Sequence, residues 1–520
     1  MALIDRPESR ATETGGLDHS LVSGMAWTAA LRWSAQVVSW VGTFYAARML
    51  MPGDYGLISM AMLAIGLARM VEDFGMDAIL VQDRGIVGDA KARLAGLLLL
   101  LGLILCALFA LASHPIALFF HEPKVGPMVV ALSVVFITDA LQVVPRAQLQ
   151  RDLQFRRLGL AQLVQVFATQ VALVTAVTLG WGHWSLVANA LAGAIAVTLL
   201  LCFWSPFLIR WPSNIASLTA PLTQGWRILA SRAAWYAYSN ADQTIIGKVL
   251  GADALGAYSF ATTFSTLAQQ EVGTIVSRVA PGIFSEVQSR IGELRRYFLL
   301  LTELLALISF PLAIGLALLA DLLIPLLLGA KWNAAIAPLQ ILCLYSVFLS
   351  SQTMLSHVLM WTGQFRVNMW CTIFSGVIMP LVFLVAVNEG VVGIAWAWAL
   401  AFPIVNIPQF RYAFRTIEIR VWDWLSTLWP AVAGCMTMAS AIVGLRWVLP
   451  ASVPVSAKCA LLIVVGAVVY LAVIWFWFKP RALRFIDLAA TIRRGTTAPP
   501  VDAPADPATR SRDGEARTSP

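Results

Sequence analysis

Apolar residues recur along this chain in runs of about twenty, separated by short segments that carry most of the polar and charged positions. A run of this length, wound as an α-helix, crosses the ~30 Å hydrocarbon core of a membrane. A β-barrel is excluded, because its strands alternate apolar and polar residues over ~10 positions, whereas residues 94–112 are continuously apolar. We therefore expect fourteen membrane-spanning helices, at residues 22–46, 55–80, 94–113, 125–144, 160–180, 184–205, 226–250, 255–279, 297–320, 334–358, 367–387, 391–413, 427–449 and 457–478.

The composition supports this fold class. Of the 520 residues, 59% are hydrophobic and 12% are charged, whereas soluble globular domains have roughly 45–50% apolar and about 25% charged residues. A water-soluble protein of this length would need more charged residues to cover its surface. The sequence predicts an all-α polytopic membrane protein and argues against a water-soluble enzyme.

Basic residues alternate between the connecting segments and predict the orientation of the helices. One side has little beyond Arg48, Lys124, Lys248, Lys331 and Lys458. The other side collects Arg84, Lys91, Arg93, Arg146, Arg151, Arg156, Arg157, Arg210, Arg290, Arg295, Arg296, Arg366, Arg415, Arg420, Lys479, Arg481 and Arg484. By the positive-inside rule the second side is cytoplasmic, and both termini lie there. The net charge of +8 follows from this orientation and indicates no nucleic-acid partner.

The connection at residues 145–159 mixes four arginines with Leu149, Leu153 and Phe155. Such a mixture is typical of an amphipathic helix lying on the anionic inner leaflet. It also suits an ordinary positive-inside loop with some helical content. The pattern leaves both interpretations open.

An internal repeat relates residues 46–61 to residues 246–261 at an offset of 200 positions. Leu50, Gly56, Ser59 and Ala61 fall on the same residue types in the second copy. The repeat equates the first span with the seventh, so the two halves share an orientation and are related by an axis along the membrane normal. We expect a polar N-terminal tail (1–21), an N-lobe of six helices (22–205), a linker (206–225), a C-lobe of six helices (226–413), two further helices (427–478) and a cytoplasmic, largely disordered tail (479–520).

Polar residues form a stripe on the first span and again on the seventh. The first stripe comprises Arg32, Gln36, Ser39 and Thr43, and the second comprises Arg232, Tyr236, Ser239 and Gln243. Each set lies on one helix face. Because a charge at mid-bilayer costs roughly 2.5–3.5 kcal/mol, we expect both stripes to face a cavity between the lobes. Guanidinium groups bind phosphate through paired donors, so this cavity favours an anionic cargo.

Other charged residues lie within predicted spans. Arg69 and Asp73 are one helical turn apart and are spaced to neutralise each other. Asp139 and Glu303 are interpreted first as structural hydrogen-bonding groups. Asp242, Glu271 and Glu303 are candidates for coupling to an ion. The six cysteines and five histidines are scattered, and there is no phosphate-cradling loop, so we predict no catalytic, metal or cofactor site.

Six segments together resemble one known family. They are residues 27–32, 46–61, 73–82, 148–158, 184–187 and 239–261. They are similar to Wzx-type, WzxC-like polysaccharide flippases of the multidrug/oligosaccharidyl-lipid/polysaccharide (MOP) exporter superfamily. The resemblance implies two six-helix lobes plus two helices, alternating access, and movement of an undecaprenyl-diphosphate-linked oligosaccharide repeat unit across the bacterial inner membrane for lipopolysaccharide or exopolysaccharide synthesis. It also implies cavity arginines on helices one, two and eight, which here carry Arg32, Arg69 and Arg278.

Two other functions fit a polytopic helical protein. A MATE-like drug/cation antiporter of the same fold would need acidic residues in its lobes, and the first span has none. A lipid-linked-sugar polymerase or ligase would need a large external loop, and the longest external connection is near residues 113–125. We expect a non-enzymatic monomer whose partners are the lipid-linked oligosaccharide, membrane lipids, and the polymerase and chain-length/export proteins of the same pathway.

Overall fold

The computed structural model describes residues 35–73, 80, 88–211, 235–267, 290–450, 452–479 and 481, and these residues contain helices and turns but no strand. Nine of the described helices are long and apolar enough to cross a membrane, or ten if a pair bent by 119° (Ala35–Met49 and Pro52–Arg69) counts as one span. This confirms a helical, multi-pass membrane protein. The expected total of fourteen spans includes segments outside the described residues and stays a prediction.

The N-lobe consists here of a helix at Ala35–Met49, α2 (Pro52–Asp73), α4 (Asp89–Phe120), α5 (Val125–Arg151), α6 (Phe155–Thr178) and α7 (Trp184–Trp204). Short turns join α4 to α5, α5 to α6 and α6 to α7. Between α6 and α7, Gly180 and Gly182 have φ angles of 77° and 55°, a left-handed backbone that glycine adopts without steric cost. The chain therefore reverses within a few residues and the two helices pack against each other.

The C-lobe begins with α9 (Ala241–Val249) and a helix at residues 251–267. It continues with α11 (Ile291–Leu327), η2 (Ala330–Ala335), α12 (Ile336–Trp361), α13 (Phe365–Ala386), η3 (Val387–Glu389), α14 (Gly390–Trp396), η4 (Ala397–Ala401), α15 (Phe402–Val405) and α16 (Ile407–Thr416). The span expected at residues 391–413 is thus divided, and η4 is a π-helical turn. Finally, α17 (Val421–Val448) and α18 (Val455–Trp477) pack on α11.

The connection at residues 145–159 contains no separate helix on the membrane surface. α5 continues through Pro145 to Arg151, and α6 begins at Phe155. The turn between them includes Leu153, whose φ is 53°. The interfacial-helix interpretation is therefore wrong. Arg146 also lies within α5, and its assignment to a loop is corrected below.

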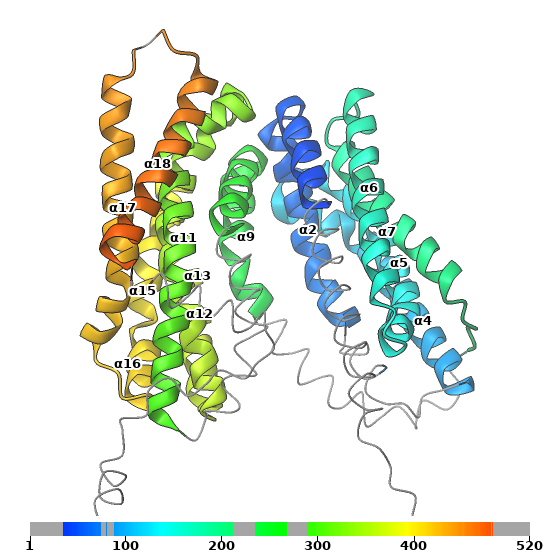
Figure 1. The fold of residues 1–520 in the computed structure, drawn as a ribbon. Helices are drawn as coiled ribbons and strands as arrows, with labels where there is room; N and C mark the ends of the chain where they lie inside the picture. Colours follow the sequence, from blue (N-terminus) through cyan, green and yellow to red (C-terminus); the bar gives the residue numbers. More distant parts are fainter. Residues whose placement is uncertain are drawn as a thin grey trace, which may run out of the picture.

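Figure 1 shows the two lobes side by side, close together at the top and further apart toward the bottom. α2 of the N-lobe and α9 of the C-lobe lie where the lobes meet. One core cluster contains buried residues of both lobes, including Met60, Phe136, Tyr258, Trp332 and Phe383. The lobes are thus joined by apolar packing as well as by the chain.

Two glycines related by the repeat lie at a close contact between the lobes. A Cβ atom added to Gly56 would lie 1.8 Å from the carbonyl oxygen of Ala252, and one added to Gly256 would lie 1.8 Å from that of Pro52. The two contacts are equivalent, because Gly56 and Gly256 are 200 positions apart, as are Pro52 and Ala252. A two-fold relation between the lobes predicts this reciprocity. The two backbones can approach this closely because Gly56 and Gly256 have a hydrogen atom in place of a side chain.

Further contacts close the same end of the molecule. The indole Nε1 of Trp332 donates to the carbonyl of Ala47 at 2.8 Å, and the ammonium of Lys331 donates to the carbonyl of Arg48 at 2.8 Å. Phe44 and Phe264 stack with ring centroids 5.7 Å apart. Trp332 and Lys331 lie at helix ends opposite the basic connections, so these hydrogen bonds join the lobes on the side that the charge pattern predicts to be external.

Candidate functional site

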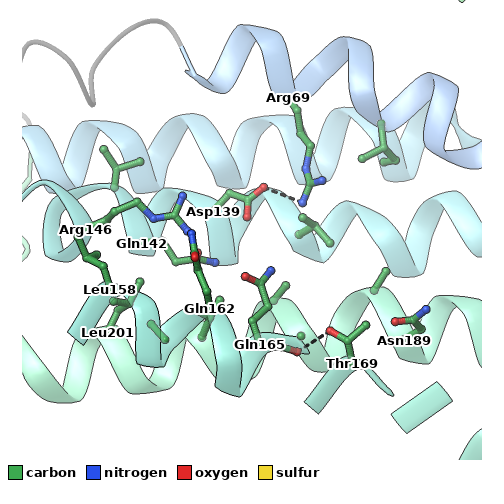
Figure 2. Close-up of a pocket in the computed structure, with 18 of the residues that line it drawn as sticks. Arg69, Asp139, Gln142, Arg146, Leu158, Gln162, Gln165, Thr169, Asn189 and Leu201 are labelled. Atoms are coloured by element: carbon green, nitrogen blue, oxygen red, sulfur yellow. Dashed lines mark hydrogen bonds and ion pairs between the residues drawn. The ribbon is translucent and has the colours of Figure 1, made fainter. Parts of the chain in front are cut away.

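The N-lobe encloses a cavity of about 760 Å³ between α2, α5, α6 and α7, which we call the N-lobe cavity. Figure 2 shows polar side chains from these helices converging on it. Apolar groups such as Ile65, Val135 and Leu201 complete its wall. Its polar lining residues are Arg69, Asp139, Gln142, Arg146, Gln150, Gln162, Gln165, Thr169 and Asn189.

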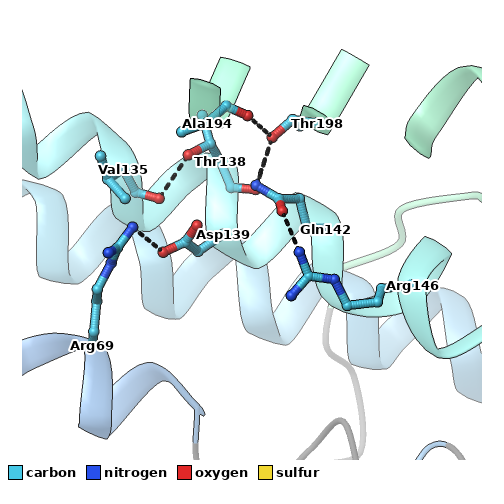
Figure 3. Close-up of polar contacts among 8 residues, drawn as sticks. All are labelled: Arg69, Val135, Thr138, Asp139, Gln142, Arg146, Ala194 and Thr198. Carbon is cyan, nitrogen blue, oxygen red and sulfur yellow. Dashed lines mark hydrogen bonds and ion pairs between the residues drawn. The ribbon is translucent and has the colours of Figure 1, made fainter. Parts of the chain in front are cut away.

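Arg69 reaches the cavity from α2. It follows Met62 and Ile65 at helical spacing, and all three line the cavity. Its Nη2 atom lies 2.9 Å from a carboxylate oxygen of Asp139 on α5 (Figures 2 and 3), and the two side chains are 43% and 31% exposed. Its Nε atom is buried without a hydrogen-bond partner among the described groups. The guanidinium is therefore held by one carboxylate and keeps donor capacity for a ligand.

Arg146 enters the same cavity from α5. Its Nη2 atom donates to the side-chain oxygen of Gln142 at 3.0 Å, and the amide nitrogen of Gln142 donates to the hydroxyl of Thr198 on α7 at 2.9 Å (Figure 3). Thr198 lies in turn 2.7 Å from the carbonyl oxygen of Ala194. This chain of neutral groups orients Arg146 without cancelling its positive charge.

Amide side chains cover the rest of the wall. Gln162 and Gln165 project from α6, and Asn189 projects from α7 (Figure 2). The Oδ1 atom of Asn189 is buried and accepts no hydrogen bond from a described group. An amide both donates and accepts hydrogen bonds, so the cavity combines guanidinium donors for an anion with amides that suit hydroxyl groups.

The structure brings one of the predicted binding residues, Arg69, into this cavity. Gln36, Tyr236 and Gln243 do not belong to its wall. The hydroxyl of Tyr236 instead lies 3.2 Å from the carbonyl oxygen of Leu63 on α2, at the contact between the lobes. Arg32, Arg232, Arg278 and Glu271 lie outside the described residues, so the expected meeting of the two polar stripes stays a prediction.

Arg69 has an ion-pair partner that the sequence did not predict, and its predicted pairing with Asp73 stays a prediction. The described partner is Asp139 on α5, while the side chain of Asp73 lies outside the described atoms. Asp139, interpreted from the sequence as a structural hydrogen-bonding group, thus forms an ion pair across two helices. Glu303 also has a pair, because Arg481 donates to its carboxylate at 3.1 Å.

Asp242, a predicted coupling residue, is buried in the C-lobe with 3% of its surface exposed. Its Oδ2 atom accepts from the hydroxyl of Tyr258 at 2.6 Å and from the indole of Trp398 at 2.8 Å. Its Oδ1 atom accepts from the backbone N–H of Gln243 at 2.7 Å. Trp398 lies in the π-helical turn η4, and such turns are frequent at functional sites. The described donors to Asp242 are therefore all neutral.

Sequence reasoning missed most of the N-lobe cavity. It assigned Arg146 to an orienting cytoplasmic loop, and it did not single out Gln142, Gln162 or Gln165. A usable signal was present, because Asp139, Gln142 and Arg146 follow one another at spacings of three and four residues, which places them on one helix face. The apolar run ends at residue 144, so the span was predicted to end there, whereas the helix continues to Arg151.

Comparisons with known proteins agree with this architecture. Residues 46–337 match the model of a family described as "Polysaccharide biosynthesis protein". The lipopolysaccharide biosynthesis protein WzxC of Escherichia coli (strain K12) is 25% identical over 397 residues, which cover 75% of this chain and 80% of the relative. The teichuronic acid biosynthesis protein TuaB of Bacillus subtilis (strain 168) is 27% identical over 349 residues, covering 64% and 70%.

Solved structures share the fold at low sequence identity. A structure of the lipid II flippase MurJ in an inward closed conformation superposes with a TM-score of 0.69 at 12% identity, over 88% of this chain and 99% of that one. An inward-facing multidrug resistance MATE family transporter of the MOP superfamily gives a TM-score of 0.58 at 15% identity, over 74% and 94%. The MOP-type fold expected from the sequence is thus confirmed.

Proposed function

We propose, since this chain belongs to the polysaccharide biosynthesis protein family, that it is a flippase of the bacterial inner membrane. Its cargo is an undecaprenyl-diphosphate-linked oligosaccharide repeat unit for lipopolysaccharide or exopolysaccharide synthesis, and it works by alternating access. The relatives named for lipopolysaccharide and teichuronic acid biosynthesis and the fold shared with a lipid II flippase support this cargo class. Both chain termini are cytoplasmic in this proposal.

The N-lobe cavity is the observation that carries the proposal. Two guanidinium groups share it, and one of them, Arg146, is held by the neutral amide of Gln142. A diphosphate entering the cavity gains Arg146 as a charged donor and competes with Asp139 for Arg69. Amides of Gln162, Gln165 and the other lining residues supply hydrogen bonds to sugar hydroxyl groups.

The same charge favours this cargo over a drug cation. The fold alone does not separate the two functions, because a MATE family transporter shares it. Asp139 is ion-paired with Arg69, and Arg146 adds a positive charge. A cavity of this polarity attracts an anion and repels a cation.

The membrane potential can supply part of the driving force. An inside-negative potential favours outward movement of negative charge by about 2.3 kcal/mol per charge per 100 mV, so a diphosphate with roughly two charges gains about 4–5 kcal/mol per 100 mV. For the return of the empty carrier, we propose Asp242 as the ion-coupling residue. Its described donors are all neutral, whereas Glu303 is ion-paired.

The test is export by cells whose own copy of the gene is deleted and replaced by variants, with membrane abundance measured in the same cells. We expect Arg146→Gln to lower export about tenfold or more at normal abundance, because a hydrogen bond to a charged group contributes about 1.5–3 kcal/mol. Arg157→Gln is the matched control, since Arg157 is exposed at the start of α6 and outside the cavity wall. Full export by an abundant Arg69→Gln, Arg146→Gln double variant would contradict the proposal.

A further inference from the structure

A second cavity of about 760 Å³ lies where the lobes meet, and we call it the inter-lobe groove. α2 and α4 form its N-lobe side, and residues 236–245 with α13 form its C-lobe side. Its lining is mainly apolar and includes Leu67, Ile116, Phe119, Ile245 and Leu384. All of these segments belong to spans that the sequence predicts to cross the membrane, and the apolar lining suits a hydrocarbon chain.

The same two turns of α2 line both the groove and the N-lobe cavity. Met62, Ile65 and Arg69 face the N-lobe cavity. Leu63, Ala64 and Leu67 face the groove. α2 therefore has a polar-cavity face and an apolar-groove face at one depth, about 10 Å apart across the helix.

One end of the groove is closed by contacts between the lobes. The ammonium of Lys248 on α9 lies 4.3 Å from the ring centroid of Phe119 on α4. A Cβ atom on Gly247 would lie 3.1 Å from the ring of Phe120, so α9 and α4 approach closely there. A chain lying in the groove therefore leads away from this end.

Tyr236 stands between the groove and α2. Its side chain lines the groove, and its hydroxyl is 3.2 Å from the carbonyl oxygen of Leu63. Gly66 makes room for it, because a Cβ atom there would lie 2.1 Å from the hydroxyl oxygen. The phenol closes the passage between α2 and the C-lobe at this level.

We propose that the inter-lobe groove binds the polyisoprenoid chain of the cargo while the diphosphate and sugars occupy the N-lobe cavity. This inference rests on the proposed function. A lipid-linked sugar must keep its chain in an apolar environment while its head group follows a polar route. The two requirements meet at α2, whose residues line both cavities.

A phospholipid acyl chain is the competing occupant. It would fill an apolar groove anywhere on the protein surface. Nothing in its chemistry would favour a groove on the helix face opposite Arg69. A polyisoprenoid diphosphate, by contrast, places an anion and a long apolar chain within reach of opposite faces of one helix. The adjacency of the two cavities therefore favours the polyisoprenoid.

The test is photo-crosslinking of the purified full-length protein in phospholipid vesicles containing radiolabelled undecaprenyl phosphate. p-Benzoyl-phenylalanine replaces Leu67 or Leu384 in the groove, and Leu111 as the control. Leu111 is 81% exposed on α4 but lies outside the groove. We expect about tenfold more label at the two groove positions, equivalent to one decade of preference in Kd, and competition by unlabelled polyprenyl phosphate. Equal labelling at Leu111, or displacement by excess phospholipid, would overturn the proposal.

A pair of substitutions separates this inference from the proposed function. Ala64→Trp fills the groove, and we expect it to remove the label at Leu384 and to reduce export. Arg146→Gln is expected to reduce export and to leave the label at Leu384 unchanged, because Arg146 lies outside the groove that holds the chain. Groove labelling with normal export by Arg146→Gln would refute the role of Arg146 in the N-lobe cavity alone, whereas reduced export without groove labelling would refute the groove alone.

Discussion

At the residue scale, the charge of Arg146 stays available to a ligand because its hydrogen-bond partner is neutral. Gln142 accepts from Arg146 and donates to Thr198, so it positions the guanidinium without pairing its charge. We predict that Gln142→Glu lowers export about tenfold at normal abundance, because a carboxylate beside Arg146 competes with the phosphate of the cargo. The export assay described above measures this.

Thr198→Val is the control for that substitution. It removes the hydroxyl that Gln142 contacts and costs about 1 kcal/mol of stability but changes no charge. We expect near-normal export from it, with a lower melting temperature. If Thr198→Val and Gln142→Glu reduce export equally, the role of Gln142 is structural.

Asp242 provides a second prediction at this scale. Asp242→Asn keeps the size of the side chain but carries no titratable charge, so we expect the protein to insert normally while export loses its response to an imposed proton or sodium gradient. Tyr258→Phe removes one hydrogen bond to the carboxylate and is expected to keep that response. Transport into inverted vesicles at set gradients provides the measurement, and an unchanged response in Asp242→Asn would exclude coupling through this residue.

At the element scale, the crossing of α2 with the helix at residues 251–267 decides how tightly the outer side closes. We predict that Gly56→Ala or Gly256→Ala shifts the lobes toward an arrangement open on that side, since the added methyl would lie 1.8 Å from a carbonyl oxygen. Overpacking costs typically about 1–3 kcal/mol, and an energy of this size shifts a two-state equilibrium roughly 5–150-fold. Spin labels at Lys124→Cys and Asn333→Cys, on the outer connections of the two lobes, report the distance.

Gly444 on α17 offers a matched control for this prediction. No atom lies within 4 Å of a Cβ added there, so Gly444→Ala should stabilise the helix by about 1 kcal/mol and leave the distance between the spin labels unchanged. An unchanged distance in Gly56→Ala as well would show that the glycine crossing does not hold the outer side closed.

At the scale of the whole molecule, the orientation in the membrane can be tested directly. Lys124 and His183 lie in the connections at one end of the N-lobe, and Arg157 lies at the other end, as does Arg296 near the start of α11. We predict that cysteines at Lys124 and His183 react with an impermeant thiol reagent in intact cells, and that those at Arg157 and Arg296 react only after permeabilisation. Labelling of Arg157→Cys from outside would invert the topology and exchange the two sides of the proposed mechanism.

The sequence by itself determined those properties that depend on one segment at a time. The minimum length of a span follows from the bilayer thickness, and the described spans overlap the apolar runs that predicted them, although α4, α5 and α11 extend beyond those runs. The repeat pointed to two equivalent lobes, and Gly56 and Gly256 meet reciprocally as that relation requires. The family resemblance, and not the local pattern, singled out Arg69 as a cavity residue, and it implied a cavity between the lobes, whereas Arg69 lines the N-lobe cavity.

Only the tertiary structure decided which side chains meet across helices. Asp139 and Arg69 are 70 positions apart in the chain, and nothing local distinguishes Asp139 from Asp73 as the partner. The linked group Arg146–Gln142–Thr198 and the division of α2 into a cavity face and a groove face depend on how α2, α5 and α7 are rotated and stacked. Rotation and stacking result from the packing of many side chains at once, so no single span contains the information that specifies them.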